Sequence, residues 1–149
     1  MNLSLCIAQG FYVGRLRPAP GTWGSFAAWW AFNLLGLGAL GPLTLLVCIG
    51  AFALGIWACT GAARALGVAD HGSVVWDEVV AVWLVLAFVP SGFWSQCWAV
   101  LLFRLFDIWK PQPIRYFDTK WKNGFGVMWD DIVAAGYTLL VLALVQRVL

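Results

Sequence analysis

Long apolar runs, separated by short polar or glycine- and proline-rich segments, dominate the hydrophobic pattern of this 149-residue chain. Five runs predict five helices, over residues 25–40, 43–63, 73–90, 93–108 and 130–149. A helix that crosses the hydrocarbon core of a bilayer needs about 20 mostly apolar residues. The first, third and fourth runs hold fewer apolar residues than this, so we expect their polar ends at the headgroup level.

The segment before these runs, residues 1–22, is mixed in character and contains Gly10 and Gly14. It predicts a short interfacial or re-entrant piece rather than a further span. Arg15 and Arg17 follow its apolar stretch instead of preceding it, which is not the order found in a cleaved signal peptide.

Composition then settles the class of protein. The chain is 62% hydrophobic and 11% charged, whereas soluble domains have about 45–50% apolar and 25% charged residues. This apolar excess cannot fit inside one small core, so a soluble globular domain, a disordered chain and a secreted disulfide scaffold are excluded. The prediction is an all-α, polytopic membrane protein with a single domain over residues 1–149.

Charge placement predicts the topology. Five alternating crossings put eight of the nine basic residues on one side of the membrane and leave only Arg147 on the other. The positive-inside rule makes that side cytoplasmic. The same side receives all seven acids: Asp70, Asp77, Glu78, Asp107, Asp118, Asp130 and Asp131. We therefore expect one polar, cytoplasmic face.

Five of these acids belong to the ends of the apolar runs. Asp77 and Glu78 open the third run, Asp130 and Asp131 open the fifth, and Asp107 lies near the end of the fourth. Acids at a helix N-terminus can simply cap it. Acids embedded in membrane helices are nevertheless costly and indicate function. Three helix ends on one face could form an oxygen cage for Mg²⁺.

Basic residues flank Asp107. In the simplest interpretation, Arg104 and Lys110 only neutralise Asp107, and Arg115 anchors the chain to anionic lipid. Beside a metal cage, however, a bidentate arginine is what a phosphate monoester requires.

Two further features are candidates for substrate binding. Residues 20–25, PGTWGS, resemble a helix start with Thr22 and Ser25 as N-cap candidates, which suits either an anion site or plain capping. His71, the only histidine, suits a general acid or base, or a solvated loop residue. The four cysteines lack metal-site spacing and predict packing residues, and the eleven tryptophans predict interfacial belts.

Four motifs together resemble bacterial phosphatidylglycerophosphatase A over about residues 10–140. They are PGTWGS (20–25), DHGSVVWDE (70–78), FRLFDIWKPQPIRYFD (103–118) and DDIVAAG (130–136). The resemblance implies a Mg²⁺-dependent, multi-pass phosphatase of the bacterial inner membrane. Such an enzyme converts phosphatidylglycerophosphate to phosphatidylglycerol and inorganic phosphate, the step before that lipid enters cardiolipin synthesis. Membrane lipids, and no nucleic acid, are the other partners expected.

The resemblance and the residue pattern together give three sets of candidate residues. The expected metal ligands are Asp77, Glu78, Asp107, Asp130 and Asp131. The expected catalytic residues are Asp77, Glu78, Asp107, Asp131, Lys110 and Arg104. The expected substrate-binding residues are Thr22, Ser25, Arg115 and His71. A metal-activated water and an aspartyl-phosphate intermediate both remain open. A small transporter and a non-catalytic lipid-binding scaffold are the alternative functions.

Overall fold

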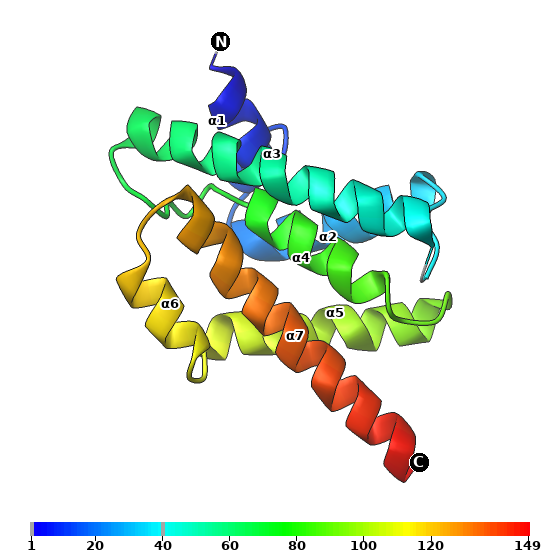
Figure 1. Cartoon of the computed structure of the whole chain (residues 1–149). Coiled ribbons are helices and arrows are strands. Elements are labelled where there is room, and N and C mark those ends of the chain that lie inside the picture. The colour runs from blue at the N-terminus through cyan, green and yellow to red at the C-terminus, as the bar shows by residue number, and fades with distance from the viewer. Residues whose placement is uncertain (1, 40) are drawn as a thin grey trace.

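The computed structural model describes residues 2–39 and 41–149, and within these it contains helices and no strand (Figure 1). The all-α prediction is therefore confirmed. The elements are α1 (Leu3–Ala8), a 3₁₀ turn η1 (Val13–Arg15), α2 (Pro20–Leu34), α3 (Pro42–Leu66), α4 (Trp76–Leu86), α5 (Phe93–Trp109), α6 (Ile114–Lys120) and α7 (Gly124–Val148).

The helix boundaries agree with the prediction for α3 and α5 and differ elsewhere. Helix α2 begins at Pro20, five residues before the predicted start, because proline is well suited to the first turn. It ends at Leu34, and the predicted end at Leu40 lies outside the described residues. Helix α7 begins at Gly124, where the Asn123 side chain accepts a hydrogen bond from the N–H of Gly126 at 2.7 Å.

Helix α4 lies at the centre of the molecule, packed against α2, α3, α5 and α7. It is shorter than the predicted run over 73–90, yet nine of its eleven residues are buried. The indole N–H groups of Trp76 and Trp83 each donate to a backbone carbonyl at 2.9 Å, Trp76 to Ala51 and Trp83 to Ala28. These two tryptophans thus hold the core together, and the interfacial-belt prediction is wrong for them.

Small residues allow α3 to approach its neighbours closely. A methyl group on Gly55 would come within 2.6 Å of the end of the Met128 side chain, so a larger residue here would force that side chain of α7 to shift. Ala51, Ala58 and Ala62 are buried on the same face. The cysteine prediction also holds for α1 and α3, whose three cysteines are buried, whereas Cys97 of α5 is half-buried.

The outer surface is strongly apolar. On α5 the exposed side chains form one stripe, at Trp94, Trp98, Leu101, Leu105 and Ile108. Helices α3 and α7, each of 25 residues with mean hydropathies of 2.1 and 1.6, are long and apolar enough to cross a bilayer. Helices α2, α4 and α5 have 15, 11 and 17 residues and are shorter than a full span.

Candidate active site

Three helices bring carboxylates to one end of the bundle, on the left in Figure 1, where α4 and α7 begin and α5 ends. Asp77 and Glu78 occupy the first turn of α4, and Asp107 lies in the last turn of α5. Asp130 and Asp131 lie about two turns inside α7. The four aspartates are only 2–8% exposed, and Glu78 is half-buried. We call these five residues the carboxylate cluster.

The cluster consists of two overlapping triads. One oxygen each of Glu78, Asp107 and Asp131 lie within 4.8 Å of one another. Oxygens of Asp77, Asp130 and Asp131 meet the same limit. Asp131 belongs to both triads, so the five side chains form one continuous group.

The position of Asp130 and Asp131 within α7 tests whether these acids serve only as helix caps. Asp130 and Asp131 do not open a helix as predicted, because α7 begins six residues earlier and Asn123 caps it. An acid two turns inside a helix receives little stabilisation from the free N–H groups at the end. Capping therefore does not explain this pair.

Arg104 and Lys110 connect the cluster from α5. Arg104 Nη1 lies 3.1 Å from Glu78 Oε1 and also donates to Asp107 Oδ2. Lys110 Nζ lies 3.2 Å from Asp130 Oδ2 and 3.8 Å from Asp107 Oδ1. Both predicted cations thus contact predicted carboxylates on other helices.

Lys110 remains a cation in this setting. Burial alone would lower the pKa of its amine, but the nearby carboxylates, led by Asp130 and then Asp131, outweigh burial and raise the pKa above its usual value. Lys110 is therefore a fixed positive charge at the site and a poor proton donor or acceptor near neutral pH.

A third group of acids contains two residues that the sequence-based site prediction does not include, Asp70 and Asp118. Oxygens of Asp70, Asp118 and Asp130 also lie within 4.8 Å of one another. Lys110 Nζ lies 3.5 Å from Asp118 Oδ1, so this group shares its cation with the carboxylate cluster. Asp118 belongs to this group because it lies on α6, a short helix between the predicted helices over 93–108 and 130–149, where the sequence pattern predicts no helix. The sequence did contain a signal for them, because Asp70 lies in the DHGSVVWDE motif and Asp118 in the FRLFDIWKPQPIRYFD motif.

The cluster itself has too few positive charges. Arg104 and Lys110 offset two of its five potential negative charges. Buried carboxylates without compensation are strongly unfavourable. Within residues 2–39 and 41–149, four buried carboxylate oxygens have no hydrogen-bond partner: Asp77 Oδ1, Glu78 Oε2, Asp130 Oδ1 and Asp131 Oδ2. Unpaired oxygens of this kind, converging from three helices, fit a hard divalent cation such as Mg²⁺.

The PGTWGS motif packs directly on this cluster. A methyl group on Gly21 would lie 2.5 Å from Glu78 Oε1 and 2.7 Å from Arg104 Nη2, which explains the glycine. Thr22 and Ser25 lie within α2, whose N-cap is Ala19, so the N-cap prediction is wrong for both. Thr22 is exposed, whereas Ser25 is buried.

The structure does not bring the remaining two substrate-binding candidates into the cluster. His71 Nδ1 lies 2.8 Å from Ser73 Oγ, and His71 lines a separate pocket of about 480 Å³ together with Arg15 and Arg17. Arg115 is exposed on α6 and makes no ion pair with any described acid.

Comparison with known proteins identifies the relatives of this chain. The phosphatidylglycerophosphatase A family model matches residues 6–146. A phosphatidylglycerophosphatase A from Haemophilus influenzae is 48% identical over 145 residues, which cover 94% of this chain and 86% of the relative. The protein of the same name from Escherichia coli is 40% identical over 132 residues, covering 86% of this chain and 74% of the relative.

A further relative carries a different name. A Bacteroides thetaiotaomicron protein, named as a candidate phosphatidylinositol-3-phosphatase, is 37% identical over 155 residues and covers 99% of this chain and 96% of its own length. No solved structure matches the chain. The matched region contains the entire carboxylate cluster.

Proposed function

The chain belongs to the phosphatidylglycerophosphatase A family, and we propose that it hydrolyses phosphatidylglycerophosphate at the carboxylate cluster. The products are phosphatidylglycerol and inorganic phosphate. One observation carries the assignment of the site: four carboxylate oxygens of the cluster, one of them on Asp131, are buried and have no hydrogen-bond partner among the described residues, beside Arg104 and Lys110. This arrangement combines a cation site with fixed positive charge for a phosphate group.

We assign the cation as Mg²⁺, held by Asp77, Glu78, Asp107, Asp130 and Asp131. When bound, Mg²⁺ would neutralise phosphate oxygens and lower the pKa of a coordinated water. The support is chemical, because carboxylate oxygens are its preferred protein ligands and phosphate commonly completes its coordination.

The side chains supply the rest of the reaction. The phosphoryl group passes to water while the bond between phosphorus and the glycerol oxygen breaks. Arg104 is positioned to neutralise the phosphate oxygens, since its Nε is buried without a partner among the described residues. Lys110 keeps its proton and holds Asp130 and Asp107 in place. A cluster carboxylate therefore accepts the proton of the attacking water and passes it to the leaving alkoxide.

We propose the membrane arrangement on the same basis. Helices α3 and α7 cross the bilayer, and α2, α4 and α5 are embedded beside them to complete five crossings of the inner membrane. The apolar outer stripe of α5 supports its contact with lipid. Eight of the nine Lys and Arg residues fall on the same side as the cluster in this arrangement, which supports a cytoplasmic active face.

The test is phosphate release from phosphatidylglycerophosphate by detergent-purified protein, with Mg²⁺ or with EDTA. We expect release with Mg²⁺ only. Phosphatidylinositol 3-phosphate belongs in the same assay, because one relative is named for that substrate. Folded protein that releases phosphate from neither lipid would favour the transporter or scaffold alternatives.

A further inference from the structure

An apolar groove of about 320 Å³ lies between α2 and α5 and reaches the active site. Most of its lining residues are hydrophobic, namely Phe26 and Trp29 from α2, and Phe93, Cys97, Val100 and Leu101 from α5. The polar members, Thr22, Ser25 and Arg104, distinguish this groove from an ordinary lipid-facing furrow.

The groove has a polar end and an aromatic end. Gly21, at the start of α2, contacts the Arg104 guanidinium. At the other end the Trp29 and Phe93 rings pack with centroids 5.8 Å apart. The Trp29 indole N–H also donates to Gln96 Oε1 at 2.8 Å. The two helices therefore run in opposite directions along the groove, and its polar groups gather at one end.

Arg104 makes the groove continuous with the carboxylate cluster. Its Nη1 pairs with Glu78 and Asp107, while its Nε is buried and has no partner among the described residues. Ser25 Oγ, at the same end, is likewise buried and unpartnered within that part of the chain. Two donors without a partner thus belong to residues that line the polar end of the groove, and an anionic headgroup that reached them would satisfy them.

The length of the groove fits one lipid chain. Phe93 and Arg104 are eleven residues apart on α5, or about 16 Å at 1.5 Å per residue. One leaflet is half of the hydrocarbon core, about 15 Å. We propose that this groove holds one acyl chain of phosphatidylglycerophosphate, with the headgroup directed past Arg104 to the cluster. The inference rests on the proposed function and adds the route by which the lipid enters.

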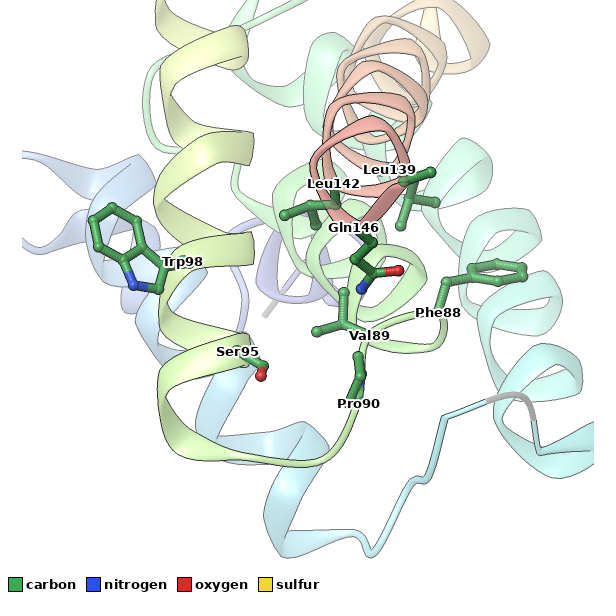
Figure 2. A pocket seen from close by; sticks show the side chains of 9 residues that line it. Phe88, Val89, Pro90, Ser95, Trp98, Leu139, Leu142 and Gln146 are labelled. Atoms are coloured by element: carbon green, nitrogen blue, oxygen red, sulfur yellow. The ribbon is translucent and has the colours of Figure 1, made fainter. Parts of the chain in front are cut away.

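A second groove provides a matched control. It has a volume of about 350 Å³ and lies between α7, the start of α5 and the segment after α4 (Figure 2). Phe88, Val89 and Pro90 line it at the C-terminal side of α4, whereas the carboxylates lie at the N-terminal side of that helix. None of its lining residues is charged, in the part of the chain that the structure describes.

The first experiment fills each groove with an indole and measures chain-length preference. Val100→Trp blocks the α2–α5 groove, and Leu139→Trp is the control in the second groove. We compare kcat/KM for dipalmitoyl and dihexanoyl phosphatidylglycerophosphate in mixed micelles. Val100→Trp should lower the preference for the long-chain lipid by about ten-fold or more, equivalent to two methylenes removed from contact. An unchanged preference in Val100→Trp, or an equal loss in Leu139→Trp, would overturn the proposal.

The second experiment needs no substitution and no turnover. Cys97 lines the groove and is half-buried, whereas the other three cysteines are buried, so a maleimide should alkylate Cys97 first. A dipalmitoyl phosphonate analogue of the substrate should slow this alkylation, and dipalmitoyl phosphatidylcholine should not. Equal protection by both lipids contradicts the proposal even in an active enzyme. If the analogue protects Cys97 but the protein releases no phosphate from the substrate, the proposed function is wrong and the lipid-binding groove is supported.

Discussion

Asp131 holds the two triads of the cluster together, because it is the only residue that both of them contain. Its Oδ2 is buried and unpaired among the described residues, and the side chain is 2% exposed. Loss of its charge should therefore weaken cation binding across the whole site, whereas loss of a peripheral acid should not.

We expect Asp131→Asn to lower phosphatase activity by at least about 100-fold, since even indirect changes around a metal cost 10–100-fold. The same substitution should abolish the rise in Tm that Mg²⁺ produces in the unaltered protein. Thermal unfolding with Mg²⁺ and with EDTA measures the second effect. Asp70→Asn, at an exposed position outside the cluster, is the control. A normal Mg²⁺ response in Asp131→Asn would show that the ion binds elsewhere.

Gly21 leaves room for the ends of the Glu78 and Arg104 side chains beside α2. The methyl group of Gly21→Ala would press on Glu78 and Arg104, so we expect activity to fall by about ten-fold or more through their displacement. Stability should change little, because alanine favours helix. Gly50→Ala is the matched control, since a methyl group there meets open space. Phosphate release measures the activity of both variants, and Tm measures their stability. Equal activities of the two variants would contradict this role of Gly21.

At the scale of elements, Lys110 joins three helices. It ends α5 in a left-handed backbone conformation, at φ 50°, and its amine reaches Asp118 on α6 and Asp130 on α7. Helix α6 has only seven residues and would be marginal alone. Its position therefore depends on contacts with its neighbours, this ion pair among them.

Lys110→Met should raise hydrogen exchange in α6 well above its effect on α3, with Lys120→Met, an exposed change on α6, as control. The pKa of Lys110 is raised, so its stabilising contribution is complete below the unfolded value of about 10.4 and is lost as the pH rises from there through the folded value. Protection of α6 should thus stay constant from pH 7 to about 10 in the unaltered protein. A decline in this range that Lys110→Met removes would contradict the assigned pKa direction.

The sequence predicts α3 and α5 well because their apolar runs end at glycine and proline. It misses the start of α7, where Gly124 and Gly126 look unfavourable for a helix. The reason is tertiary: a methyl group on Gly124 would strike Thr60, and one on Gly126 would strike the Trp121 carbonyl oxygen. Helix α6 is missed because its residues follow two prolines and lack an apolar period.

The site likewise combines features that the local sequence predicts with features that depend on the fold. Acids in apolar runs are visible in the sequence, and the five predicted carboxylates do converge. The sharing of Asp131 between triads, and the approach of Asp118, depend on helix rotation and on α6, which local sequence does not encode. His71 and Arg115 were predicted from the motifs that contain them, and the fold places both outside the cluster.

For the whole molecule, the number of crossings is the decisive property. Five crossings put the connection between α4 and α5 on the periplasmic side. If only α3 and α7 crossed, this connection would lie on the same side as the carboxylates. Ser91, which is exposed in this connection, and Gly72, exposed in the connection before α4, report the two sides.

We expect Ser91→Cys to react with a membrane-impermeant maleimide in spheroplasts, and Gly72→Cys to react only after lysis. The unaltered chain, with Cys97 present, gives the background. Labelling of Gly72→Cys before lysis would reverse the orientation. Protection of Ser91→Cys until lysis would reduce the number of crossings.

The shortness of the central helices has a mechanical consequence. Helix α4 has 11 residues and its lipid-facing neighbour α2 has 15, which correspond to about 16 and 22 Å, against a hydrocarbon thickness of about 30 Å. In the proposed membrane arrangement, we expect the lipid beside α2 to thin locally to match this short helix. This local thinning of the bilayer would bring lipid headgroups closer to the carboxylates without requiring a lipid to leave its leaflet. Turnover should accordingly slow in vesicles of thicker lipid, which makes bilayer thickness itself a regulator of this step in lipid synthesis.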